Sequence, residues 1–163
     1  MIESYEISAL LVDDEVCFRQ GIRNLLDFYS NQNSLAINIV GEAKSVDRLD
    51  KLTEVASPDM ILLELELAVG NGITALVLLK EISYQGKILI LSGHQEVDWI
   101  FRAMLAGASG YVFKSKIATQ LCEAINTVMN SDIYLPSEVA SRFFKYFQNH
   151  SESPLRTYHK LRI

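Results

Sequence analysis

A short apolar run that ends in acidic residues opens the recurring pattern of this chain: Ile7-Ser8-Ala9-Leu10-Leu11-Val12-Asp13-Asp14-Glu15. Four further apolar runs follow at a nearly even pitch, without strict alternation of polar residues: residues 36–40, 60–63, 88–91 and 111–113. Such runs are typical of strands covered on both faces of a parallel sheet. They end 22 to 28 residues apart, close to the length of about 30 residues of a strand-helix-strand unit.

Amphipathic helices are expected between these runs. Apolar residues form helical stripes, with spacings such as i, i+3, i+4 and i+7, in three intervening segments: residues 22–29, 97–105 and 121–129. Two more segments are helical by length and propensity: residues 46–56 and 73–82. Strand-helix repeats of this length require crossover connections. The sequence therefore predicts an α/β fold, a doubly wound five-stranded parallel sheet with helices on both faces.

Turn and cap residues agree with this alternation. Glycines such as Gly41 and Gly110 fall between the expected strands and helices. Ser45 and Ser137 are candidate N-caps, because their hydroxyl groups accept hydrogen bonds from the first turn of a helix.

Composition and charge exclude several classes of protein. The 163 residues suit one domain, and 15 basic against 20 acidic residues give a net charge of −5. This balance argues against direct nucleic-acid binding, which needs a positive footprint. The longest uncharged stretch, residues 67–79, is shorter than the roughly 18 apolar residues of a membrane span. The start lacks the pattern of a secretory signal, so we expect a cytoplasmic location and no membrane partner.

Polar side chains follow four of the five expected strands. Asp13 and Asp14 follow the first strand, Glu64 the third, Ser92 the fourth and Lys114 the fifth. Because the carboxyl ends of parallel strands meet at one edge of a sheet, we expect these residues to converge. Carboxylates with an ammonium and a hydroxyl suit Mg²⁺ and a phosphoryl group. Each residue alone has a simpler interpretation as a helix cap, a surface lysine or a turn serine, so the predicted site depends on their joint position.

Four segments resemble the receiver domain of two-component response regulators: Leu11-Val12-Asp13-Asp14-Glu15, Pro58-Asp59-Met60-Ile61-Leu62-Leu63-Glu64, Leu91-Ser92-Gly93 and Ala106-Gly107-Ala108-Ser109-Gly110-Tyr111-Val112-Phe113-Lys114. The last segment is most similar to the NarL/LuxR-like branch, which usually carries a helix-turn-helix output domain. The resemblance spans residues 7–131 and implies a flavodoxin-like fold with strand order 2-1-3-4-5.

The resemblance also implies roles for the predicted site. Carboxylates would bind Mg²⁺, here Asp13, Asp14 and the residue after the third strand, which in the family is an Asp that accepts phosphate from a histidine kinase. Ser92 would move onto the phosphoryl group, Tyr111 would follow this movement, and Lys114 would pair with the phosphoryl oxygens. The implied partners are a histidine kinase or another response regulator.

The chain departs from the family pattern at the centre of the site. Glu64 stands at the phosphoacceptor position, and Ala68 stands where the family usually has Pro. The extra methylene extends the carboxylate by roughly 1.5 Å, and a misplacement of about 1 Å can slow a positioned reaction ~100-fold. We therefore expect poor acyl-phosphate formation on Glu64. The longer side chain would instead reach Lys114 and Ser92 and imitate the phosphorylated state; that it only balances the charge of Lys114 is an equally open alternative.

The chain divides into two parts in this interpretation. Residues 1–131 form the receiver-like domain, and residues 132–163 form an extension with a short aromatic helix and a flexible basic tail. Phe101 is expected in the core. The candidate partner surface consists of aromatic residues from both parts: Trp99, Phe143, Phe144 and Phe147. Docking of the extension on its own domain and homodimerisation both remain open.

The predicted function is that of an atypical receiver, not an enzyme, which signals through protein contacts independently of phosphorylation. The alternative class is a flavodoxin-like small-molecule binder or a phosphatase on the same scaffold. No glycine-rich phosphate loop follows the first strand, which counts against a flavin protein. A second alternative is a shortened DNA-binding-type regulator that acts by mixed dimerisation, since the 32 residues after residue 131 are too few for a helix-turn-helix output domain.

Overall fold

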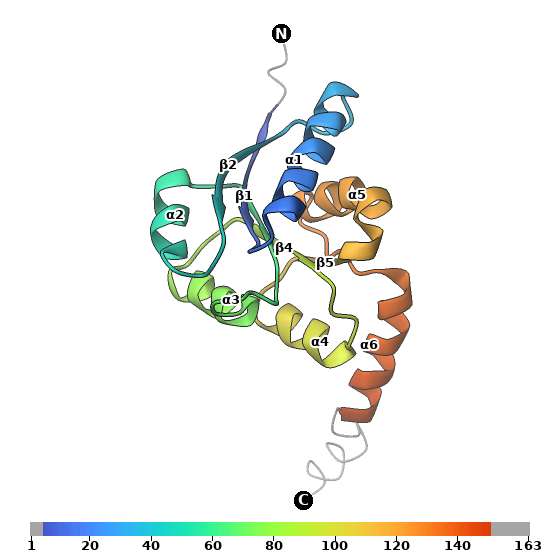
Figure 1. Ribbon diagram of the computed structural model, residues 1–163. Helices are drawn as coiled ribbons and strands as arrows, with labels where there is room; N and C mark the ends of the chain where they lie inside the picture. The colour runs from blue at the N-terminus through green and yellow to red at the C-terminus, as the bar shows by residue number, and fades with distance from the viewer. Residues whose placement is uncertain (1–4, 151–163) are drawn as a thin grey trace, which may run out of the picture.

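Five parallel strands form one sheet in the order β2-β1-β3-β4-β5 (Figure 1). The computed structural model describes residues 5–150, and its strands are β1 (Ile7–Val12), β2 (Ile37–Ala43), β3 (Met60–Leu63), β4 (Lys87–Ser92) and β5 (Gly110–Phe113). The predicted flavodoxin-like topology is confirmed. Because the chain leaves β1 in one direction to β2 and later returns on its other side to β3, a crevice is expected at the carboxyl ends of β1 and β3.

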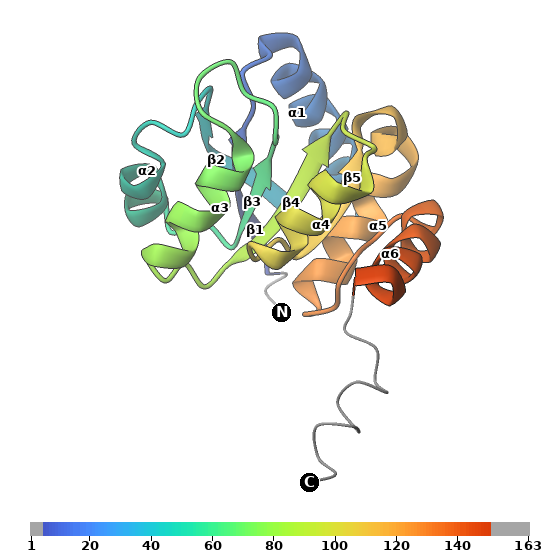
Figure 2. The ribbon, with the colours of Figure 1, turned by 90° about the horizontal axis from the view of Figure 1, so that it is seen from below.

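Helices cover both faces of the sheet (Figure 2). On one face lie α1 (Val16–Asn31) and α5 (Ile117–Met129), and on the other lie α2 (Leu49–Ala56), α3 (Gly72–Glu81) and α4 (Val97–Leu105). A short 3-10 helix, η1 (Lys114–Lys116), follows β5, and α6 (Ser137–His150) follows α5. The side chains of β1, β3, β4 and β5 are buried on both faces, which explains why these apolar runs do not alternate. Strand β2, at the edge of the sheet, alternates between more buried and exposed residues. Within residues 5–150 no helix has both the length and the apolar character to cross a membrane.

Strand β2 is longer than predicted because Gly41 lies inside it. The register between β1 and β2 shifts between Ala9 and Leu10, which inserts an extra residue and lets β2 continue to Ala43. A Cβ atom on Gly41 would lie 2.9 Å from Leu10 Cδ1. This glycine therefore permits close approach of β1 and does not end the strand.

Helix α2 begins later than predicted, and Ser45 is not its cap. The Ser45 hydroxyl accepts a hydrogen bond from the Asp47 N–H at 3.3 Å, ahead of the helix. Arg48 occupies the N-cap position with φ of 63°, in the left-handed region. This backbone turn prevents residues 46–48 from joining the helix.

Helix α6 packs on α4 through one apolar face. Val139 is buried in the cluster that includes α4. The rings of Phe143 and Tyr146 contact Phe101, with centroids 5.2 and 4.7 Å apart. Phe101 was predicted in the core but is only half-buried, because it faces α6 and not the sheet.

The opposite face of α6 is open to solvent. Phe144 is 73% exposed and Phe147 is 57% exposed. Ser137 is the first helical residue and not the predicted cap, since the carbonyl of Pro136 accepts the first hydrogen bonds of the helix. The division of the chain at residue 131 stays a prediction, and the predicted basic tail, residues 151–163, lies outside the described residues.

Candidate functional site

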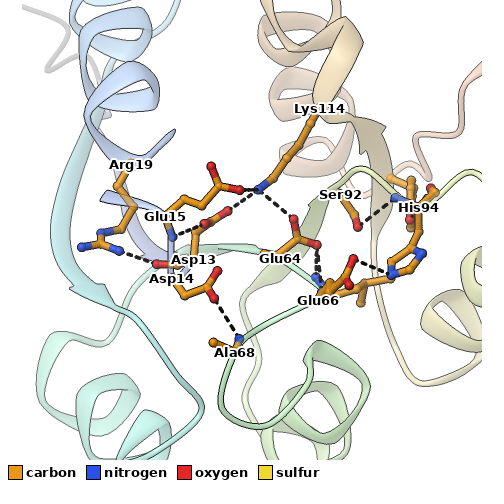
Figure 3. Close-up of polar contacts among 12 residues, drawn as sticks. Asp13, Asp14, Glu15, Arg19, Glu64, Glu66, Ala68, Ser92, His94 and Lys114 are labelled. Atoms are coloured by element: carbon orange, nitrogen blue, oxygen red, sulfur yellow. Dashed lines mark hydrogen bonds and ion pairs between the residues drawn. The ribbon is translucent and has the colours of Figure 1, made fainter. Parts of the chain in front are cut away.

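The carboxyl ends of the strands bring Asp13, Glu64 and Lys114 together (Figure 3). Val12 pairs with Leu63 in the sheet, so the residues that follow β1 and β3 are neighbours. Lys114 follows β5 as the first residue of η1 and reaches across the strand ends to both carboxylates. The convergence expected from the strand ends therefore holds for these three side chains.

Lys114 bridges two buried carboxylates. Its Nζ lies 2.8 Å from Asp13 Oδ2 and 2.8 Å from Glu64 Oε2. Asp13 is 1% exposed and Glu64 is 4% exposed. The ring of Phe18 lies 4.0 Å from the same ammonium group, at a distance suited to a cation-π interaction. Glu15 Oε1 lies further away, at 3.9 Å, so the ammonium is held by two close carboxylates and a more distant third, and is shielded by an aromatic ring.

The charges of this cluster are strongly coupled. Burial raises the pKa of Asp13, and hydrogen bonds with Lys114 and the Glu15 N–H offset this only in part. Burial alone would lower the pKa of Lys114, but its hydrogen bonds with Asp13 and Glu64 outweigh burial and raise that pKa. Lys114 therefore stays charged at neutral pH, and it is the counter-charge that allows two carboxylates to be buried side by side.

Both carboxylate oxygens of Glu64 are engaged. Oε1 accepts hydrogen bonds from the backbone N–H groups of Leu65 at 2.6 Å and Glu66 at 2.9 Å, while Oε2 pairs with Lys114. The extra methylene lets the side chain fold back over the residues that follow it. Glu64 therefore fills a cradle of two N–H donors and one ammonium.

The loop between β3 and α3 is closed on itself. The N–H of Gly72 donates to the carbonyl of Leu65 at 2.8 Å, and Glu66 forms an isolated bridge with Asn71. A Cβ atom on Gly72 would lie 2.6 Å from the carbonyl oxygen of Glu64. Only glycine permits this contact, which fixes the backbone beside the carboxylate.

Asp14 binds this loop and not Lys114. Its Oδ2 accepts a hydrogen bond from the Ala68 N–H at 2.8 Å. The predicted Mg²⁺ ligands, Asp13, Asp14 and Glu64, supply the carboxylate oxygens that this ion prefers, but Lys114 already neutralises two of them. Among residues 5–150 no group of three His, Cys, Asp or Glu side chains is arranged to hold a metal ion. As they lie, these residues do not fit Mg²⁺, and its binding stays a prediction.

Ser92 and Tyr111 are buried beside the site, but within residues 5–150 neither forms a hydrogen bond with Glu64. We expected Ser92 within reach of the longer carboxylate, but no hydrogen bond joins them in the described part of the chain; instead Ser92 Oγ accepts from the His94 N–H at 3.3 Å. The Tyr111 hydroxyl donates to the His94 carbonyl at 2.8 Å, and burial raises the pKa of Tyr111. The backbone of His94 therefore links both predicted switch residues.

His94 is the site residue that the sequence prediction missed. Its Nε2 lies 3.2 Å from Glu66 Oε2 and its Nδ1 lies 3.3 Å from Glu96 Oε2. The imidazole stacks on Trp99 with centroids 4.9 Å apart, and Trp99 is half-buried; its place on a partner surface stays a prediction. The only signal in the sequence was the position of His94 just after Ser92, because a single histidine has no diagnostic spacing.

The family follows from comparison with known proteins. A model of the response regulator receiver domain matches residues 9–126. The chain belongs to this family. It is a signalling domain of two-component systems rather than a classical enzyme, and receiver domains interact with kinases and dimerise.

Curated relatives of this receiver domain are longer proteins. The nitrate/nitrite response regulator NarL of Escherichia coli K12 is 30% identical over 126 residues, which is 77% of this chain and 56% of NarL. The response regulator VraR of Staphylococcus saprophyticus is 31% identical over 134 residues, which is 82% of this chain and 61% of VraR. The receiver domain therefore spans about three fifths of the length of these relatives.

Solved structures agree with this family. A LuxR-family response regulator from Aurantimonas sp. SI85-9A1 has a TM-score of 0.78 at 27% identity, covering 87% of this chain and 98% of that one. RcsB of Salmonella typhimurium has a TM-score of 0.77 at 19% identity, covering 98% of this chain and 80% of that one. At this identity the likeness shows only that the fold is shared. The predicted likeness to the NarL and LuxR branch is confirmed.

Proposed function

We propose that this receiver domain signals through protein contacts without phosphorylation of Glu64. The observation that carries the proposal is the engagement of both Glu64 carboxylate oxygens by the N–H groups of Leu65 and Glu66 and by Lys114. A carboxylate that attacks a phosphoryl group must present a free oxygen lone pair in line with the leaving group. Oε1 accepts two hydrogen bonds and Oε2 carries the pair with Lys114, so three of the roughly four lone pairs of the carboxylate are engaged. Attack could come only from the remaining lone pair of Oε2, whose charge the ammonium already holds, and this disfavours phosphorylation.

The same contacts support mimicry of the phosphorylated state. A phosphoryl group would place negative charge beside Lys114 and accept hydrogen bonds from neighbouring N–H groups, and the Glu64 carboxylate does both. The mimicry extends to the ammonium and the backbone donors but not to the hydroxyl of Ser92, which binds His94 instead. In the competing interpretation Glu64 only balances the charge of Lys114.

A chain of contacts leads from Glu64 to helix α4. Glu64 accepts from the Glu66 N–H, the Glu66 carboxylate pairs with His94, and His94 stacks on Trp99. Trp99 lies in α4, so the state of the carboxylate has a physical route to the surface of that helix. We propose that α4, together with α6, presents this state to a histidine kinase or another response regulator.

Fluorescence of Trp99, the only tryptophan of the chain, tests this route. Glu64→Gln keeps the size of the side chain but removes its charge, so the pair with Lys114 weakens and the contacts out to His94 loosen. We expect a shifted emission spectrum in Glu64→Gln and no shift in Glu81→Gln, an exposed control in α3. We expect that acetyl phosphate with Mg²⁺ leaves the parent spectrum unchanged and deposits no phosphate.

Two outcomes would contradict the proposal. Acid-labile phosphate on Glu64 of the parent would show that phosphorylation occurs. A Glu64→Gln spectrum identical to that of the parent would favour the interpretation in which Glu64 only balances the charge of Lys114.

Dimerisation through α6, which would also allow mixed dimers with longer regulators, is a second candidate function, favoured by the exposed face of α6 and by the likeness to longer regulators. In this proposal Phe144 and Phe147 are the contact residues, while the half-buried Phe143 packs against Phe101 of α4. Size-exclusion chromatography with light scattering should show a dimer that Phe144→Asp/Phe147→Asp converts to a monomer. Phe28→Asp, which changes an exposed aromatic residue of α1, should leave the dimer intact. A monomeric parent would remove self-association through α6.

A further inference from the structure

An open groove of about 510 Å³ lies beside α2, where the chain leaves the carboxyl end of β2. It is separate from the Lys114 cluster, and none of the residues assigned to the receiver site lines it. Its volume falls within the range of roughly 300–1,000 Å³ that small-molecule sites occupy. The residues that decide its chemistry are Lys44, Asp47, Arg48, Lys51, Leu52 and Val55.

Positive charge gathers on this groove in a protein of net charge −5. Lys44, Arg48 and Lys51 all line it. Across residues 5–150 none of the three forms an ion pair with a carboxylate within 4.0 Å. The groove therefore holds three cationic side chains whose charge no fixed partner offsets.

The acidic residues of the groove do not cancel this charge. Glu42 lines it, but the Glu42 carboxylate is held by Arg23 at 2.8 Å and faces Arg19 at 3.9 Å. Asp47 is then the one lining carboxylate without such a pair in the described residues. The local balance favours an anionic occupant.

Part of the groove lining is apolar. Leu52 and Val55 lie one helical turn apart on α2, and Val55 is 87% exposed. An occupant with an apolar body would bury this surface, which stabilises binding in proportion to the area removed from water. Asp50 in the first turn of α2 offsets the field of the helix N-terminus, so the attraction for an anion comes from the three cationic side chains.

We infer that this groove binds a small organic anion, with its charged group among Lys44, Arg48 and Lys51 and its apolar body on Leu52 and Val55. The inference does not rest on the proposed role of Glu64. The ligand needs both its anionic group and its apolar body. The cationic side chains bind the anionic group, and the exposed apolar side chains bind the apolar body. Most of these side chains are exposed, so they can be replaced without disturbing the core.

The test uses the whole chain and the probe 8-anilinonaphthalene-1-sulfonate, which carries one anionic group on an aromatic body. We expect saturable binding of one probe per chain, with amide resonance shifts confined to residues 42–55. The variant Lys44→Gln/Arg48→Gln/Lys51→Gln should bind roughly fivefold more weakly, because three exposed charge interactions, each weakly stabilising, are lost. The matched control is Lys80→Gln/Arg142→Gln/Lys145→Gln, which removes the same charges from α3 and α6 and should bind like the parent.

Further measurements separate the contributions of charge and body. Inorganic phosphate should bind far more weakly than the probe, and Val55→Asp should abolish probe binding. The inference is overturned if no saturable binding occurs, if the groove variant binds as tightly as the parent, or if the control variant loses binding instead, which would place the probe on α3 or α6. If phosphate binds as tightly as the probe does, the role assigned to Leu52 and Val55 is overturned.

Discussion

Lys114→Met should lower the free energy of unfolding by about 3 kcal/mol at pH 7, because it leaves two buried carboxylates side by side without a counter-charge. Removing one partner of a buried ion pair costs about 3–5 kcal/mol, and the partial exposure of the Lys114 side chain places this case at the lower end. Urea unfolding measures the effect. Lys116→Met, which replaces an exposed lysine two residues away, should change stability by less than about 0.5 kcal/mol.

The loss of stability caused by Lys114→Met should become smaller as the pH falls. Burial already raises the pKa of Asp13 in the folded protein. A carboxyl group with a raised folded-state pKa destabilises the fold above that pKa, and this cost disappears as the pH falls through it. Without Lys114 the pKa of Asp13 rises further. The difference in the free energy of unfolding between Lys114→Met and the parent should therefore be smaller at about pH 5 than at pH 7. An equal penalty at both values would contradict the ion-pair explanation.

Glu64→Asp should take up phosphate at least about 100-fold faster than the parent when both are incubated with acetyl phosphate and Mg²⁺. The shorter side chain cannot fold back onto the N–H groups of Leu65 and Glu66 as Glu64 does. It therefore frees a carboxylate oxygen for attack and leaves those donors available to the phosphoryl oxygens. Intact-mass measurement of acid-labile phosphate gives the rate.

Glu64→Gln is the matched control for this experiment, because it keeps the length of the side chain and removes the nucleophilic charge. It should carry no phosphate. Equal labelling of parent and Glu64→Asp would show that side-chain length does not limit the reaction. An unlabelled Glu64→Asp would show that the cluster of Asp13 and Lys114 does not support phosphorylation.

The sequence was sufficient for the sheet and for the central ion cluster. Apolar runs that are buried on both faces have a distinctive pattern. The backbone positions just after parallel strands lie at one edge of the sheet, whichever way their side chains point. This is why Asp13, Glu64 and Lys114 could be placed together before the structure was known. Residues inside a strand or directly at its end have positions that the sheet itself determines, so their neighbours can be predicted from the strand order.

The remaining features depend on side-chain direction and on local backbone geometry. Asp14 turns to the Ala68 N–H, and Ser92 turns to His94, and neither choice has a signal in residue spacing. His94 matters because two loops meet at its ring. The extension of β2 through Gly41 depends on a bulge, which spacing alone does not reveal.

The closed loop after β3 lowers the conformational entropy that is lost when a group binds beside Glu64. Gly72 locks the backbone beside Glu64 through its bond to Leu65, so the two N–H donors are already oriented before any group reaches them. The conformational entropy of that arrangement is lost once, when the protein folds, and not again when a side chain or ligand oxygen is exchanged. The backbone donors of Leu65 and Glu66 therefore stay oriented when the group at position 64 is exchanged, while the pair with Lys114 and the contacts of the Glu66 side chain respond to that group.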